Sequence, residues 1–210
     1  MNVTLDEDAA NRLRECVTAG GVAVFPSDTV YGVCCDPDNE EAARRLYALK
    51  GRPSARSCAV MFFALEDALE VLDDLHERER EALDALLPGP VTVLLANRSR
   101  RFHSACRVDP GTLGLRVPRL TGALEALSTV GVPVLQSSAN LSGEPDARTL
   151  EQVPEQLREG ADLVIDGGEL RGTPSTVVDL RDLDEERRFH VLREGALPRE
   201  NVEHAMAALV

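Results

Sequence analysis

Short apolar runs of strand length, separated by segments of helical periodicity, restrict the fold of this chain more than any other feature. The strand-like runs occupy residues 20–28, 58–63, 88–97, 111–118, 132–136, 161–168 and 174–180. Apolar residues recur at helical spacing in residues 40–50, 66–87, 121–130 and 199–210. Strands that alternate with helices, and are sometimes adjacent in sequence, predict a mixed α/β or α+β sheet with helices packed on it.

Length and composition predict one soluble domain. A chain of 210 residues with 43% hydrophobic content can bury one substantial core, and no linker or repeat divides it, so we expect a single domain over 1–210. The acidic start and the lack of a long apolar run predict a soluble, cytoplasmic protein. Five cysteines without a C-x-x-C pair argue against a disulfide framework and a zinc site. We expect reduced thiols, mostly buried, and no metal held by the chain itself.

Charge is unevenly distributed along the sequence. The formal net charge is −13, so the surface as a whole repels nucleic acid. Residues 42–65 and 88–108 nevertheless contain basic residues and no acidic ones. This segregation favours a positive cleft that concentrates small anions. The alternative is that these stretches are only the basic faces of patterned helices.

The single lysine of the chain lies in one of these stretches. Lys50 ends a predicted helix, and Gly51 and Pro53 start a loop that carries Arg52 and Arg56. A cation at a helix end gains only about 0.3–1 kcal/mol from the helix dipole. Three converging cations repel one another unless a polyanion joins them, which predicts a triphosphate site. The chain has no G-x-x-x-x-G-K-[ST] motif, so the site is not a P-loop.

Polar side chains cluster where several predicted strands end. Between the first strand and the first helix, Ser27, Asp28 and Thr29 offer two hydroxyls and a carboxylate. Residues 134–145 run from a strand into a second cluster, formed by Ser137, Ser138, Asn140, Ser142 and Gly143. These groups can hold phosphate oxygens, a ribose or the water shell of Mg²⁺. Both clusters are also compatible with ordinary turns and caps.

Two further strand segments carry candidate binding groups. Arg116 alternates out of an apolar strand and must meet an anion or solvent, because an unpaired buried charge is very costly. A carboxylate held by two hydrogen bonds would satisfy it, whereas an edge strand would leave it solvated. Ser175 and Thr176 open the strand at 174–180.

Seven short motifs occur in the sequence in this order: PSDTVYGV, KGRP, PGPVTVLL, GLRVP, SSANLSG, PSTVVDL and LREG. Together they resemble the YrdC-like family of threonylcarbamoyl-AMP synthases, and the resemblance runs from about Gly20 to the C-terminus. The resemblance implies a twisted mixed sheet with flanking helices and a concave positive cavity. It implies an L-threonylcarbamoyladenylate synthase, a nucleotidyltransferase that combines L-threonine, bicarbonate and ATP into threonylcarbamoyl-AMP and pyrophosphate. The expected route is an N-carboxythreonine whose carboxylate attacks the α-phosphate. A separate transferase then modifies tRNA at the adenosine beside the anticodon.

The same resemblance implies roles for individual residues. Lys50 and Arg52 would be catalytic, and with Arg56 they would hold the triphosphate of ATP. The rest of the nucleotide and its Mg²⁺ would be surrounded by Thr112, Ser138, Asn140 and Arg193. The threonine would be held by Thr29, Arg116 and Ser175, with Arg116 on its carboxylate. No protein nucleophile is needed, since the work is positioning and charge neutralisation.

The sequence departs from the family pattern in two places and leaves alternatives open. Pro-Ser-Asp-Thr replaces the usual Pro-Thr-Asp-Thr, and Met61 falls about where members often have a histidine near the threonine pocket. A carbamoyl-transfer maturation factor of the hydrogenase type is one alternative, although such chains are longer and carry zinc-binding cysteines. A non-catalytic binder of double-stranded RNA or ribosomal precursors is another alternative. Weak contact with tRNA or double-stranded RNA is compatible with both the synthase and this binder. The charge of −13 disfavours RNA as the main partner.

Overall fold

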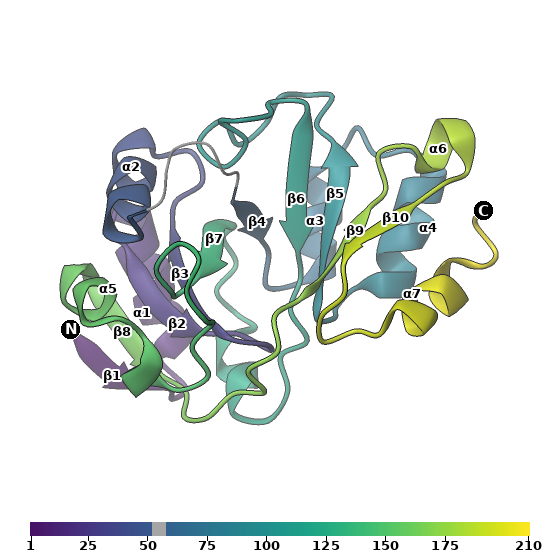
Figure 1. Ribbon diagram of the computed structural model, residues 1–210. Coiled ribbons are helices and arrows are strands. Elements are labelled where there is room, and N and C mark those ends of the chain that lie inside the picture. The colour runs from purple at the N-terminus through teal and green to yellow at the C-terminus, as the bar shows by residue number, and fades with distance from the viewer. Residues whose placement is uncertain (52–57) are drawn as a thin grey trace.

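The computed structural model describes residues 1–51 and 58–210. Within these ranges, ten strands form one sheet in the order β1-β8-β2-β3-β7-β4-β6-β5-β9-β10 (Figure 1). The strands are β1 Asn2–Thr4, β2 Ala23–Pro26, β3 Tyr31–Cys35, β4 Ala59–Met61, β5 Val91–Ala96, β6 Thr112–Arg116, β7 Val134–Ser138, β8 Leu163–Asp166, β9 Thr176–Asp179 and β10 His190–Arg193. Parallel and antiparallel neighbours are both present, so the predicted mixed sheet is confirmed.

Helices flank the sheet on both sides. They are α1 Ala9–Thr18, α2 Glu40–Leu49, α3 Leu65–Val71, α4 Glu77–Leu86, α5 Glu155–Gly160, α6 Leu183–Glu186 and α7 Arg199–Met206, with short 3₁₀ helices η1 Gly122–Leu127 and η2 Leu150–Gln152. In Figure 1, α1, α2 and α5 lie with the N-terminal strands, and α4, α6 and α7 lie with the strands at the opposite end of the sheet. The helix predicted at 121–130 is therefore present as a 3₁₀ turn.

Strand alternation divides the core into two clusters on opposite faces of the sheet. On one face, Val33, Val60 and Leu115 belong to the larger cluster, which α2, α4 and α7 help to cover. On the other face, Phe25 and Met61 belong to a smaller cluster that includes apolar residues of α1 and η1. The smaller cluster leaves part of its face free for a cavity.

Several elements were not predicted from the sequence. No strand was predicted between the strand-like run at 20–28 and the helix at 40–50, but β3 begins at Tyr31 and forms an antiparallel hairpin with β2. Its YGVCC sequence is completely buried and continues the polar motif without a break, so no turn signal marks its start. The helix α1 and the short edge strands β1 and β10 were also missed.

The helix α2 positions the single lysine. The Asn39 side chain accepts a hydrogen bond from the backbone N–H of Ala42, and Glu40 and Glu41 lie in the first turn, where carboxylates favour a helix start. Buried residues on one face of α2 include Leu46 and Tyr47, which belong to the larger core cluster. The helix ends at Leu49 with Lys50 as its C-cap, as the sequence predicted.

The cysteines agree with the expectation of reduced, mostly buried thiols. All five cysteines are free, and Cys34, Cys35, Cys58 and Cys106 are buried. Burial raises the pKa of Cys106 to about 11 and that of Cys35 to about 12, so both thiols stay protonated at neutral pH. In the described part of the chain no helix has the length and apolar character needed to cross a bilayer.

Candidate active site

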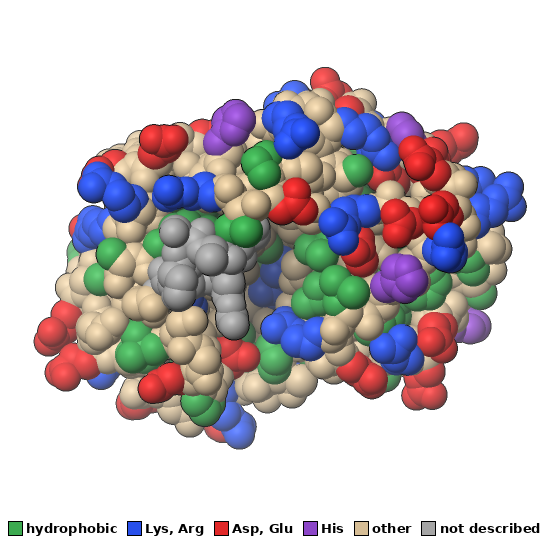
Figure 2. All heavy atoms as spheres, turned by 45° about the horizontal axis from the view of Figure 1, so that its top comes forward, with side chains coloured by type: hydrophobic (Ala, Val, Ile, Leu, Met, Phe, Trp, Pro, Cys, Tyr) green, Lys and Arg blue, Asp and Glu red, His purple; other side chains and the backbone are tan. Residues whose placement is uncertain are grey.

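A cavity of about 370 Å³ opens on the face of the sheet that carries the smaller core cluster. Strand register explains its lining. Met61 pairs with Arg116 on one side and with Val134 on the other, and two residues back Ala59 pairs with Gln136. These paired residues point to the same face. Figure 2 shows the resulting hollow in the surface, with basic side chains inside it.

The structure brings together most of the residues predicted for ATP and threonine. The cavity is lined by Thr29, Lys50, Arg116, Ser138, Asn140, Ser175 and Arg193, which come from six separate segments of the chain. Thr112 is not in this lining: it lies at the start of β6, where its hydroxyl donates to Asp109 and accepts from Arg181. Arg52 and Arg56 lie outside the described residues. The roles predicted for all ten residues stay predictions.

Lys50 enters the cavity from the end of α2. Its side chain is only 2% exposed, and Nζ donates to the backbone carbonyl of Ser138 and, at 3.2 Å, to Oδ1 of Asn140. Asn140 Oδ1 also accepts from the Ser138 hydroxyl at 2.6 Å. These two contacts hold the ammonium against the segment after β7, in the wall of the cavity.

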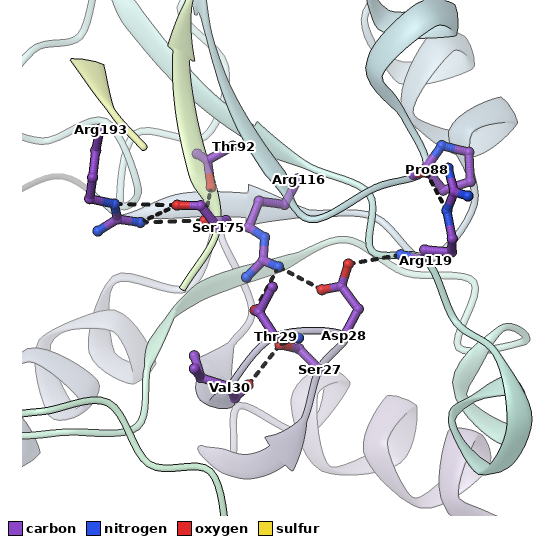
Figure 3. A network of polar contacts seen from close by, with 10 residues as sticks. All are labelled: Ser27, Asp28, Thr29, Val30, Pro88, Thr92, Arg116, Arg119, Ser175 and Arg193. Atoms are coloured by element: carbon purple, nitrogen blue, oxygen red, sulfur yellow. Dashed lines mark hydrogen bonds and ion pairs between the residues drawn. The ribbon is translucent and has the colours of Figure 1, made fainter. Parts of the chain in front are cut away.

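Arg116 is buried at the end of β6 and pairs with Asp28. Its Nη2 lies 2.8 Å from Oδ1 of Asp28 and 3.2 Å from the Thr29 hydroxyl, while Oδ2 of Asp28 accepts from the backbone N–H of Arg119 (Figure 3). Burial raises the pKa of Asp28 and lowers that of Arg116, because both charged groups have left water. Arg116 thus meets an anion, as predicted, and the edge-strand alternative is wrong because β6 lies between β4 and β5.

The guanidinium of Arg116 is not fully satisfied by these partners. Its Nε is buried and has no hydrogen-bond partner among the described residues. Arg116 also lines the cavity. A buried guanidinium with a spare donor is suited to a second carboxylate.

Ser175 and Arg193 form the opposite wall. Arg193 Nη2 donates to the Ser175 carbonyl at 2.8 Å, and the Ser175 hydroxyl shares a hydrogen bond of 2.8 Å with Thr92 on β5 (Figure 3). These contacts join the start of β9 to the end of β10. Ser175 and Arg193 both line the cavity, together with Thr29 and Lys50.

Gly195 allows this wall to pack. A Cβ built on Gly195 would lie 2.2 Å from the Pro174 carbonyl oxygen and 2.7 Å from the Ser175 carbonyl, which are backbone atoms that cannot rotate away. We expect Gly195→Ala to destabilise the protein by about 1–3 kcal/mol, because overpacking forces the backbone to shift. Thermal unfolding measures this as a fall in Tm of about 2–4 °C per kcal/mol. Gly111→Ala is the control, since the neighbour there is the Asp109 side chain at 3.3 Å.

Most of the described basic residues in the two acid-free stretches do not line the cavity. Arg44 and Arg45 of α2 pair with Glu41 and Asp162 on the surface, and Arg98 pairs with the buried Glu79. Among the described residues of both stretches, Lys50 is the one basic side chain in the cavity lining. The alternative of basic helix faces therefore fits α2, whereas Arg116 and Arg193, which also line the cavity, come from β6 and β10.

Three further residues can be compared with the sequence. Ser27 is a turn residue, in agreement with the turn interpretation of its cluster, since its hydroxyl donates to the Val30 carbonyl at 2.7 Å and the residue is 1% exposed. Met61 is fully buried in the smaller core cluster and is not among the residues that line the cavity. Gln136 does line the cavity and was missed, because only the pairing of β7 with β3 and β4 shows which face it occupies.

A polar cavity lined by lysine, arginine and hydroxyl groups on a mixed sheet defines a protein suited to small anionic ligands. The Sua5/YciO/YrdC family, described as "Telomere recombination", matches residues 15–195. The chain belongs to this family, as the sequence motifs indicated.

Related sequences and structures agree with this assignment. The chain is 37% identical to a threonylcarbamoyl-AMP synthase of Stutzerimonas stutzeri (strain A1501) over 174 residues, which cover 79% of this chain and 89% of that protein. It is 33% identical to a threonylcarbamoyl-AMP synthase of Pyrococcus abyssi (strain GE5 / Orsay), of which the match covers 57%.

Solved structures show the same fold. P. abyssi Sua5 complexed with L-threonine superposes with a TM-score of 0.83 at 28% identity, covering 100% of this chain and 60% of that one. E. coli YciO superposes with a TM-score of 0.79 at 26% identity, covering 96% of this chain and 98% of that one. A HypF structure at 19% identity and a TM-score of 0.62 shares the fold alone.

Proposed function

We propose that this protein is an L-threonylcarbamoyladenylate synthase, an enzyme that makes threonylcarbamoyl-AMP and pyrophosphate from L-threonine, bicarbonate and ATP. The observation that carries the proposal is the convergence of Lys50, Ser138 and Asn140 with Thr29 and Arg116 in one cavity. A relative that is 37% identical to this chain over the aligned residues is named threonylcarbamoyl-AMP synthase. The L-threonine complex of P. abyssi Sua5 supports an amino-acid site in this fold.

The amino acid would bind at the Arg116 side of the cavity. The carboxylate of the amino acid would accept a hydrogen bond from Nε of Arg116, which has no partner among the described residues. The guanidinium would then bind both Asp28 and the substrate. Thr29 and Ser175 would complete this subsite with hydroxyls, which hydrogen-bond without adding charge. Holding the amino group in a fixed place beside the nucleotide makes an encounter of several reactants effectively intramolecular.

The nucleotide would bind at the Lys50 side. The ammonium of Lys50, with Arg52 and Arg56 of the following segment, would neutralise the triphosphate and the charge that develops as pyrophosphate leaves. Arg193 and Thr112 are the further nucleotide contacts that the family motif suggests. This chain would act as a nucleotidyltransferase by positioning the carboxylate of N-carboxythreonine against the α-phosphate, with no covalent enzyme intermediate.

Mg²⁺ would enter with ATP as part of the substrate. Within the described residues, no group of three His, Cys, Asp or Glu side chains could hold a metal ion. The cavity does present the oxygens of Ser138 and Asn140, together with the carboxylates of Glu144 and Asp146. Mg²⁺ keeps several waters and binds through few protein oxygens plus phosphate, which this donor set fits. The ion would supply charge neutralisation at the phosphates.

The product would pass to a separate transferase that acts on tRNA. A mixed anhydride of a carbamate and AMP is reactive toward water, so direct handover in the cytoplasm suits its chemistry. Weak contact with tRNA would have to be local, because the chain has a formal charge of −13.

Pyrophosphate release tests the proposal. We expect the protein, incubated with ATP, Mg²⁺ and bicarbonate, to release pyrophosphate only when L-threonine is added. The matching product, threonylcarbamoyl-AMP, is identified by mass spectrometry. Release that does not depend on any amino acid would contradict the proposal. Tight binding of double-stranded RNA without any pyrophosphate release would support the non-catalytic alternative.

A further inference from the structure

A second cavity lies next to the first and has no part in the proposed reaction. Its volume is about 260 Å³, and Asp28 lines it, whereas the next residue, Thr29, lines the first cavity. Two arginines, Arg119 and Arg171, also line the second cavity. In Figure 3, Arg119 lies on the opposite side of Asp28 from Ser175, which lines the first cavity. The chain segment at Asp28 therefore separates two cavities that each contain arginine.

The two carboxylates in the lining of the second cavity are both paired with arginines outside that lining. Asp28 lies 2.8 Å from Arg116, which lines the first cavity. Glu169 forms an ion pair with Arg148. Each carboxylate is thus balanced by a cation that does not line the second cavity, and neither is left to neutralise the arginines that do.

Arg119 and Arg171 keep their positive charge without an ion pair. The guanidinium of Arg119 donates through Nε and Nη2 to the carbonyl of Pro88, which is a neutral acceptor. The side chain of Arg171 makes no hydrogen bond or ion pair with any described residue. Both residues are exposed, so an ion from solvent can reach them. The second cavity is therefore locally positive, although the chain as a whole has a formal charge of −13.

Hydrogen bonds fix the backbone of the wall that carries Arg171. The backbone N–H of Gly167 donates to the Tyr31 hydroxyl at 3.0 Å. The backbone N–H of Gly172 donates to the Thr29 carbonyl at 2.9 Å. These two bonds hold both ends of the segment against the hairpin of β2 and β3. A wall that is already in place lowers the cost of ordering the site when a ligand binds.

The chemistry of the lining selects a class of ligand. A guanidinium presents a planar fork of N–H donors, which matches the paired oxygens of a phosphate or a carboxylate. The volume lies just below the range of about 300–1,000 Å³ that is typical of ligand pockets, so the ligand is small. The other lining residues include the neutral side chains of Pro90, Thr121, Ala123, Leu124 and Leu170. These side chains can contact an uncharged part of the ligand.

We propose that the second cavity binds a small oxyanion, the phosphate or carboxylate group of a small molecule, through Arg119 and Arg171. This site is separate from the cavity assigned to ATP and threonine, and it does not depend on the proposed function. Its two arginines would supply charge-assisted hydrogen bonds, which are shorter and stronger than those between neutral groups.

Nuclear magnetic resonance tests the proposal in the full chain. We titrate isotope-labelled protein at constant ionic strength with inorganic phosphate and, separately, with succinate, and follow the backbone amide signals. Thr121 and Leu124 report on the second cavity, and Ser138 reports on the first. We expect saturable shifts of Thr121 and Leu124 with at least one of the two probes. Arg171→Gln should weaken this binding by about tenfold or more, because it removes hydrogen bonds to a charged ligand.

The control is Arg187→Gln, which removes an exposed arginine that lines neither cavity and should change the affinity by less than about twofold. The spectrum of each variant shows directly whether it is folded. Shifts at Thr121 and Leu124 that Arg171→Gln weakens selectively uphold the site, and the probe that binds more tightly identifies the ligand group as phosphate or carboxylate.

Three results would overturn the site. The first is the absence of saturable shifts at Thr121 and Leu124, including the case in which phosphate shifts only Ser138 and its neighbours in the first cavity. The second is binding that is unchanged in Arg171→Gln. The third is an equal loss in Arg187→Gln, which would show a general effect of net charge. Since the titration contains neither ATP nor threonine, its outcome is independent of the test by pyrophosphate release.

Discussion

Lys50→Ala is expected to lower kcat/KM for pyrophosphate release by at least about 30-fold, which corresponds to more than about 2 kcal/mol of transition-state stabilisation. Lys50 is only 2% exposed, and its ammonium donates to oxygens of Ser138 and Asn140 in the cavity wall. A residue that only capped α2 would contribute about 0.3–1 kcal/mol through the helix dipole. The two interpretations therefore predict effects that differ by an order of magnitude.

Two companion variants sharpen this experiment. Arg44→Ala removes a cation from the exposed face of the same helix, where it pairs with Glu41, and should leave kcat/KM within about twofold. Lys50→Arg keeps the charge but replaces a compact, mobile ammonium with a rigid planar fork. If the ammonium follows the phosphate charge as pyrophosphate leaves, Lys50→Arg loses about tenfold or more. A Lys50→Ala enzyme with nearly normal kinetics would eliminate the triphosphate role of Lys50.

Arg116→Gln should raise the KM for threonine by about 100-fold or more and should also destabilise the protein. Arg116 is buried and lies 2.8 Å from Asp28. Its Nε has no hydrogen-bond partner among the described residues, so it can donate to a substrate carboxylate. Removing one partner of a buried ion pair typically costs about 3–5 kcal/mol, because the other charge is left uncompensated. Steady-state kinetics and thermal unfolding measure the two effects separately.

The double variant Asp28→Asn with Arg116→Gln separates binding from stability. Removing the stranded carboxylate should restore much of the lost Tm, while the KM for threonine stays high because the substrate carboxylate still lacks its cation. Arg119→Gln is the control, since its exposed guanidinium donates to the Pro88 carbonyl and is expected to change the KM by less than about threefold. Recovery of threonine affinity in the double variant would contradict the assignment of Arg116.

The stability of Arg116→Gln should also depend on pH. Burial already raises the pKa of Asp28, and loss of Arg116 removes the charge that opposes this shift. The folded state then holds a proton on Asp28 more strongly than the unfolded state does. The deficit relative to wild type is therefore largest above the raised pKa and shrinks as the pH falls through it. Unfolding at pH 8 and at pH 5 checks the sign.

Much of the architecture could be read from local patterns. Alternating apolar runs and helical spacing predicted the mixed sheet, the helix that ends at Lys50 and most of the central strands, because periodicity records which side of an element is buried. The hydroxyl and amide cluster after β7 was likewise visible as a polar segment that follows an apolar strand. Elements with weak or interrupted patterns, such as β3 and α1, were missed.

Tertiary structure decided which of these local features meet. The sequence determined that Arg116 must meet an anion or solvent, but its partner Asp28 is 88 residues away and is brought to it by the pairing of strands. Acid-free stretches marked Arg44 and Arg45 as candidates for a cleft, whereas packing turned them to the surface. Gln136 carries no local signal at all, and only the register of β7 between β3 and β4 turns its amide into the cavity. Hydrophobic periodicity is a property of neighbouring residues, while strand order and register depend on contacts made across the whole chain, so the cavity exists only once the sheet has formed.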